Sequence, residues 1–94
     1  MYQLDENDIK KRVWNKYVGI ENWIILCPGG CRKYITRKKF ECARIKSEKN
    51  GGGFNLLNLV PVCRNCSNNI SYMNMTDFVI YQKSLKFIDK TNVF

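Results

Sequence analysis

Two short stretches, Cys27-Pro28-Gly29-Gly30-Cys31 and Cys63-Arg64-Asn65-Cys66, decide how this chain folds. Each stretch places two thiols close together, and residues 32–62 separate the two pairs. A structural zinc ion takes four thiolates at about 2.3 Å in a tetrahedron, and each close pair can supply two corners. The second pair has the usual two-residue gap, and the Pro-Gly-Gly gap of the first can turn tightly enough to reach the same ion. The spacing predicts one structural zinc ion per chain, held by Cys27, Cys31, Cys63 and Cys66.

Two other interpretations of these cysteines stay open, namely disulfides in a secreted protein and ordinary buried thiols. The N-terminal stretch MYQLDENDIKKR is charged and lacks the apolar segment of a signal peptide, so we expect an intracellular protein that is not secreted. The expected location is the cytoplasm or nucleus of a host cell, or a virion. The fifth cysteine, Cys42, is expected to pack as a small apolar side chain and not to bind the metal.

The charge of the chain indicates a polyanionic partner. The 94 residues carry 16 Lys and Arg against 8 Asp and Glu, a net charge of +8, and no histidine. A small basic domain of this kind most often meets nucleic acid, although the same charge could face an acidic protein. No apolar run is long enough to cross a membrane, so no membrane partner is expected.

We expect one small α+β domain over residues 1–94, with a zinc-bound core over about 27–71 between two helices. The N-terminal helix should span about 5–18, begin with Asp5 as its cap and Leu4 packed on Ile9, and end near Gly19. Its apolar face should hold Ile9, Val13, Trp14 and Tyr17. The C-terminal helix should span about 76–89, capped by Thr76-Asp77, with Phe78, Tyr81, Leu85 and Ile88 at helical spacing.

The core between the cysteine pairs should contain a β-hairpin. Alternation over 40–46 predicts a strand, residues 48–53 form a glycine-rich loop, and the apolar run 56–62 returns to the second pair. Asn58 lies among those apolar residues, so its amide should hydrogen-bond the backbone and fix the loop. Residues 67–69, Ser-Asn-Asn, can cap a short helix, whereas 33–39 is predicted as a basic loop.

Taken together, these pieces resemble the HNH (His-Asn-His) endonucleases, in particular the small HNH proteins encoded by large DNA viruses. The resemblance covers about residues 10–80. It rests on residues 13–19 (VWNKYVG), 40–43 (FECA), 47–52 (SEKNGG), 58–63 (NLVPVC) and Asn74-Met75, together with the four paired cysteines. It implies a ββα-metal core, in which a hairpin around the glycine loop is followed by a helix and the four-cysteine zinc site ties the flanks together.

The resemblance also implies a catalytic centre, and this chain departs from it. The family places a general-base histidine at the end of the first strand, an orienting asparagine in the loop, and a metal-binding histidine or asparagine on the helix. Here the matching positions are Arg44, Asn58 and Ser67. Arginine stays protonated and cannot accept a proton from water, and a cation at this position repels Mg²⁺. Glu41 and Glu48 are the nearby carboxylates that an unusual catalytic centre could recruit.

We therefore expect a degenerate HNH protein that binds nucleic acid, chiefly duplex DNA, without cutting it and without bound Mg²⁺. Arginine at the former base position can hold a phosphate in place of activating water. The expected phosphate contacts form a basic cradle with Arg44 at its floor: Lys33, Arg37, Lys38, Lys39, Arg44, Lys46, Lys49 and Arg64. One alternative is a structural zinc subunit of a larger assembly, such as a viral transcription complex or virion. The other is an active metal-dependent nuclease with an atypical centre.

Overall fold

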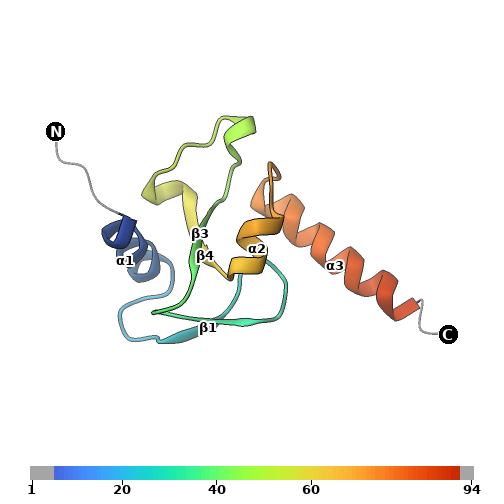
Figure 1. The fold of residues 1–94 in the computed structure, drawn as a ribbon, viewed down its shortest axis with the longest axis horizontal. Coiled ribbons are helices and arrows are strands. Elements are labelled where there is room, and N and C mark those ends of the chain that lie inside the picture. The colour runs from blue at the N-terminus through green and yellow to red at the C-terminus, as the bar shows by residue number, and fades with distance from the viewer. Residues whose placement is uncertain (1–5, 92–94) are drawn as a thin grey trace.

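The helices and strands of this protein follow one another in a mixed order, with both hairpins lying between the first and last helix (Figure 1). The structure is a computed structural model that describes residues 6–91. It is a small α+β fold with two antiparallel sheets of two strands each, which confirms the expected class. The elements are α1 (Glu6–Tyr17), β1 (Ile24–Leu26), β2 (Tyr34–Thr36), β3 (Glu41–Arg44), β4 (Leu59–Val62), α2 (Arg64–Asn69) and α3 (Met75–Thr91).

Helix α1 buries Val13 and Trp14, as its apolar spacing predicts. The Trp14 ring packs 5.2 Å from that of Phe40, and its Nε1 donates a hydrogen bond to the Asn22 carbonyl at 3.0 Å. The helix ends at the predicted position, where Gly19 adopts a φ of 106° that favours glycine. Tyr17 is exposed, so its assignment to the core face is wrong. The predicted cap at Asp5 and the Leu4 contact lie outside the described residues.

The predicted hairpin forms from β3 and β4, which pair antiparallel with Glu41 opposite Val62 and Arg44 opposite Leu59. Helix α1 packs against both strands, and α2 lies on the other side against β3 (Figure 1). All four residues of β4 are buried as a result. Pro61 is opposite Cys42 in a non-hydrogen-bonded pair, where a backbone N–H would point away from β3. The N–H that proline lacks is therefore not needed for pairing of the two strands.

Asn58 fixes the long loop between these strands, as its sequence position predicts. Its Oδ1 accepts a hydrogen bond from Lys46 N at 2.8 Å, and its Nδ2 donates to the carbonyls of Lys46 at 2.9 Å and Gly53 at 2.8 Å. Gly52 lies against the same backbone, because a Cβ on it would come 1.8 Å from the Lys46 carbonyl oxygen. The buried Ser47 adds a second set of bonds to the loop: its N donates to Asn74 Oδ1 at 2.8 Å, and its Oγ accepts from Asn50 Nδ2 at 2.8 Å.

A second hairpin, formed by β1 and β2, was not predicted. Ile24 pairs with Thr36 and Leu26 with Tyr34, so part of the predicted basic loop over 33–39 is a strand. The guanidinium of Arg37 donates hydrogen bonds to the carbonyls of Gly19, Ile20 and Asn22 after α1. This side chain therefore links the second hairpin to the end of the first helix.

The last two helices begin earlier than predicted. Cys63 is the N-cap of α2, so the predicted cap residues, Ser67, Asn68 and Asn69, lie within the helix. Helix α3 starts at Met75, one residue before the predicted cap, and buries Phe78, whereas Tyr81 and Leu85 are exposed. The C-terminal half of α3 runs away from the hairpins (Figure 1). Within residues 6–91, no helix combines the length and apolarity needed to cross a membrane.

Candidate functional site

The four predicted cysteines converge on one point. The Sγ atoms of Cys27, Cys31, Cys63 and Cys66 all lie within 4.8 Å of one another, and Cys31 and Cys63 are 3.6 Å apart. In a tetrahedral thiolate site with metal–sulfur bonds of about 2.3 Å, the sulfurs are about 3.8 Å apart. The donor set and its spacing therefore fit one metal ion, and we call these residues the cysteine cluster.

The two hairpins and α2 bring the cluster together. Cys27 follows β1, and Cys63 lies between β4 and α2, where its side chain caps the helix by accepting from Cys66 N at 3.4 Å. The Pro-Gly-Gly turn is tight, as predicted: a Cβ on Gly29 would lie 2.7 Å from the Cys66 sulfur. Glycine at this position is what allows the first pair to approach the second.

The environment of the sulfurs suits metal-bound thiolates. Sγ of Cys27 accepts from Gly29 N at 3.4 Å and Cys63 N at 3.2 Å, and Sγ of Cys31 accepts from Lys33 N at 3.4 Å. Burial nevertheless raises the pKa of Cys27 to about 11, and burial together with neighbouring thiols raises the pKa of Cys66 further. Without a metal these two thiols are protonated at neutral pH, so metal binding must release protons.

Two further residues, the fifth cysteine and a glutamine of α3, bear on the ligand set. Cys42 is half-buried and is not among the clustered sulfurs, in agreement with its predicted exclusion from the metal site. Gln82 of α3 donates from Nε2 to Sγ of Cys66 at 3.4 Å, a contact that sequence reasoning missed. Helical periodicity places Gln82 one turn after Phe78, but nothing local shows that this face meets a cysteine.

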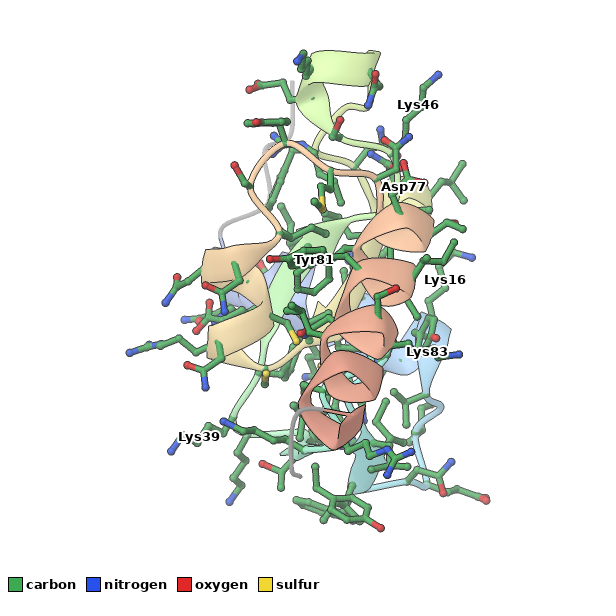
Figure 2. All side chains as sticks on the ribbon, turned by 90° about the vertical axis from the view of Figure 1, so that its right-hand side faces the viewer. Lys16, Lys39, Lys46, Asp77, Tyr81 and Lys83 are labelled. Carbon is green, nitrogen blue, oxygen red and sulfur yellow. The ribbon has the colours of Figure 1, made fainter. Side chains whose placement is uncertain are left out.

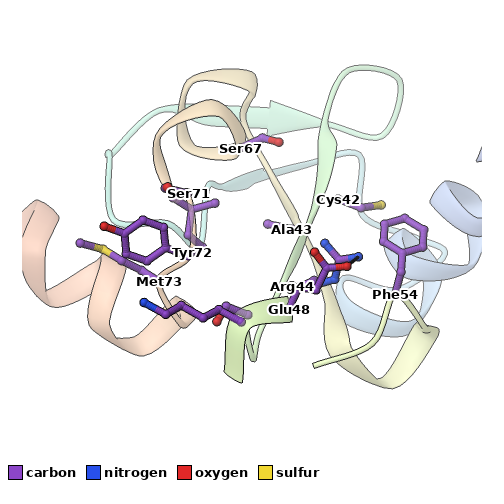
Figure 3. Close-up of a pocket in the computed structure, with 12 residues that line it drawn as sticks. Cys42, Ala43, Arg44, Glu48, Phe54, Ser67, Ser71, Tyr72 and Met73 are labelled. Atoms are coloured by element: carbon purple, nitrogen blue, oxygen red, sulfur yellow. Dashed lines mark ion pairs between the residues drawn. The ribbon is translucent and has the colours of Figure 1, made fainter. Parts of the chain in front are cut away.

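A cavity of about 390 Å³ has Ser67 of α2 in its lining, and we call it the Arg44 pocket. It lies between β3, the glycine loop and the segment that joins α2 to α3 (Figure 3). Two of the three positions matched to a catalytic centre, Arg44 and Ser67, line it. The third position, Asn58, is outside the lining, and its side-chain amide is hydrogen-bonded to the loop backbone.

Arg44 is the central cation of this pocket. Its side chain is 33% exposed, and its guanidinium lies 4.0 Å from the carboxylate of Glu48, which is 83% exposed. Such an exposed ion pair is weak, so an anion that binds Arg44 more strongly can displace the Glu48 carboxylate. The Nε of Arg44 is buried and has no hydrogen-bond partner among residues 6–91. The part of the guanidinium that an oxyanion could reach is the Nη2 end, where the weak ion pair with Glu48 lies.

The structure does not gather the eight predicted phosphate-binding residues around one cradle. Arg44 and Lys49 line the Arg44 pocket, Arg37 and Lys38 line a hollow beside α1, and Lys39 and Arg64 line a third beside β2. Figure 2 shows Lys39 and Lys46 at opposite ends of the molecule. Lys33 lies beyond the first cysteine pair, before β2. Only two members of the predicted set therefore share the pocket that contains Arg44.

The carboxylates that could serve an atypical centre are separated. Glu41 forms ion pairs with Lys10 and Arg64, each at 3.4 Å, on β3. It does not line the Arg44 pocket, whereas Glu48 does. The pocket lining thus contains one carboxylate, which is paired with Arg44.

Two aromatic residues of the pocket, Phe54 and Tyr72, were missed by sequence reasoning. Phe54 follows three glycines, and an aromatic side chain directly after such a loop is a signal that could have indicated it. Tyr72 lies in the turn before α3, and only the packing of that turn brings it to the pocket.

Comparison with known protein families, curated proteins and solved structures finds no match to this chain.

Proposed function

We propose that the cysteine cluster binds one structural zinc ion, because four thiolates in a closed tetrahedral arrangement are a typical zinc ligand set. All four positions are filled by protein sulfur, so no place is left for a reacting water. Cys27, Cys31, Cys63 and Cys66 would hold the ion. The ion would stabilise the folded protein, because it would join both hairpins and α2, which share only a small hydrophobic core.

We further propose that the protein binds nucleic acid through its phosphate backbone without cutting it. The observation that carries this proposal is Arg44, whose partly exposed guanidinium lies at the end of β3, lines the Arg44 pocket and makes an ion pair of 4.0 Å with the exposed Glu48. Arginine binds phosphate through fork-shaped, charge-assisted hydrogen bonds. The net charge of +8 would add long-range attraction to a polyanion such as duplex DNA.

The absence of cleavage follows from the chemistry of the same pocket. A nuclease needs a general base, which contributes roughly 10²- to 10⁴-fold in rate, and arginine cannot act as one. Ser67 offers a neutral hydroxyl, a poor ligand for Mg²⁺. The hairpin, helix and cysteine cluster support the inference that the chain descends from HNH endonucleases and has lost their catalytic centre.

A specific observation favours a second candidate, a structural subunit of a larger assembly. One face of the β1–β2 hairpin exposes Ile24, Leu26 and Tyr34, and Trp23, just before β1, is also exposed. Exposed apolar residues gathered on one sheet face are typical of protein contacts. In that case the basic surface would meet an acidic partner protein.

Duplex binding over a salt series, with a plasmid nicking assay on the same sample, separates these candidates. A backbone binder loses affinity with a logarithmic slope of about 0.9 per phosphate contact, and it leaves the plasmid intact with Mg²⁺ or Mn²⁺. Absence of duplex affinity at low salt would favour the subunit. Metal-dependent nicking that disappears in Glu48→Ala would show an active nuclease. Recovered nicking in the Arg44→His, Ser67→Asn double variant would support nuclease ancestry.

A further inference from the structure

The walls of the Arg44 pocket pair a cation with an aromatic ring on each side. The guanidinium of Arg44 lies 5.3 Å from the centroid of the Phe54 ring, and Nζ of Lys49 lies 4.7 Å from that of Tyr72. Figure 3 shows Phe54 and Tyr72 on opposite sides of the pocket, with Arg44 beside Phe54. All four side chains belong to the same cavity lining.

We propose that this pocket binds a single-stranded segment of nucleic acid, with phosphate held by Arg44 and Lys49 and unpaired bases stacked on Phe54 and Tyr72. The inference rests on the proposed function and names the form of nucleic acid that the pocket takes. Phe54 is 52% exposed and Tyr72 is 63% exposed, so each ring has surface left for a base. In a duplex the flat faces of the bases are already stacked on their neighbours, whereas a single strand can offer them to aromatic side chains.

Hydrogen bonds fix the backbone on both sides of each aromatic residue before any ligand binds. On one wall, Phe54 stands between Gly53, whose carbonyl accepts from Asn58 at 2.8 Å, and Asn55, whose Oδ1 accepts from Leu57 N at 3.1 Å. On the other, Tyr72 lies in a turn closed by a bond from Met73 N to the Ile70 carbonyl at 3.0 Å. A fixed backbone lowers the cost of ordering these two segments on binding, which favours binding.

The bottom of the pocket supplies polar groups between the rings. Ser67 and Ser71 add hydroxyls to the lining, and Ser71 lies on the side of Tyr72 (Figure 3). A partner protein would need to match two cations, two hydroxyls and two separated rings in one small cavity. Alternating phosphates and bases match that arrangement directly.

The test compares a fluorescent 12-nucleotide oligothymidine strand with a 12-base-pair duplex, using the intact zinc-loaded protein. We expect tighter binding of the single strand, and loss of about 5- to 150-fold for each of Phe54→Leu and Tyr72→Leu, which keep apolar bulk but remove the ring. Duplex affinity should change little. Tyr17→Leu, on an exposed tyrosine of α1, is the matched control. In Tyr72→Trp, base stacking should quench indole emission beyond any change seen in the unmodified protein, whose Trp14 and Trp23 set the background.

The outcomes separate this inference from the proposed function. Equal affinity for both forms, unaffected by the two leucine variants and lost on Arg44→Gln, would overturn the single-strand inference and leave backbone binding intact. No binding of either form at low salt would overturn both. Thermal melting shows whether either leucine variant has a folding defect. In that case Tyr72→Trp, which preserves an aromatic ring, is the variant that tests stacking. Single-strand binding without quenching of indole emission would contradict stacking.

Discussion

Asn58 is the residue on which the shape of the long hairpin loop depends most. Its place among apolar residues made the hydrogen bonding predictable, because an amide in such a run must find backbone partners. The partners themselves, Lys46 and Gly53, follow from the hairpin register. Arg37 shows the opposite case. It was expected to bind phosphate, but it donates to carbonyls after α1, a contact set by tertiary packing that no local pattern reports.

Replacing Asn58 with alanine should lower the free energy of unfolding by about 2–3 kcal/mol, because backbone groups of the loop lose their partners. Chemical denaturation measures this. Asn55→Ala is the control, since its side chain accepts a single exposed bond from Leu57 N, and it should lose about 1 kcal/mol or less. Equal losses in the two variants would contradict the role given to Asn58.

Glu48 forms an ion pair of 4.0 Å with Arg44, and in the proposed function it would compete with phosphate for that guanidinium. Glu48→Gln should therefore tighten nucleic-acid binding by up to about fivefold, in line with the strength of an exposed ion pair. Fluorescence anisotropy at fixed salt measures the change, and Glu21→Gln, an exposed carboxylate before β1, is the charge-matched control. Weaker binding in Glu48→Gln than in the control would show that the carboxylate assists the site.

At the scale of elements, the long periodic segments were predictable and the short ones were not. The pattern over 40–62 predicts the β3–β4 hairpin because strand alternation and a glycine loop coincide. Strands β1 and β2 have three residues each, too few to show a period, and β2 lies in a run of lysines. Their hairpin is held by the cysteine cluster at its tip and by Arg37 at its base.

The two tryptophans should differ sharply in their contribution to stability. Trp14 joins α1 to the hairpin core and is fully buried, whereas Trp23 is largely exposed on the second hairpin. Trp14→Phe removes the bond to Asn22 and leaves a void, so it should destabilise by roughly 1–3 kcal/mol. Trp23→Phe should change stability by about 0.5 kcal/mol or less. A larger loss in Trp23→Phe, measured by thermal melting, would contradict this packing.

For the whole molecule, the cysteine cluster was predictable from the sequence and the arrangement of the basic residues was not. Cysteine spacing alone names Cys27, Cys31, Cys63 and Cys66, because a shared ion requires that the pairs meet. Which basic residues share a surface depends on how the two hairpins are oriented, and the sequence contains no pattern for that. The predicted cradle is therefore divided among three hollows.

Removal of the metal should unfold the protein. Binding to such a site supplies of order 10 kcal/mol, comparable with the whole stability of a small domain. A strong chelator, or the single change Cys63→Ser, should abolish the cooperative melting transition seen by circular dichroism. Cys42→Ser should retain one zinc per chain by metal analysis. Unchanged melting after complete metal removal would contradict a structural role for the ion.

The most direct test of the account is the affinity of Arg44→Gln for nucleic acid, measured beside Arg12→Gln. Both changes remove one positive charge, but Arg12 is an exposed residue of α1 that lines none of the three hollows described above. We expect Arg44→Gln to weaken binding by about tenfold or more for all nucleic-acid sequences, and Arg12→Gln to change it little. In Arg44→Gln the logarithmic slope of affinity against salt concentration should also fall by about one. Equal, small losses in both variants would contradict it, because the Arg44 pocket would then be no binding site.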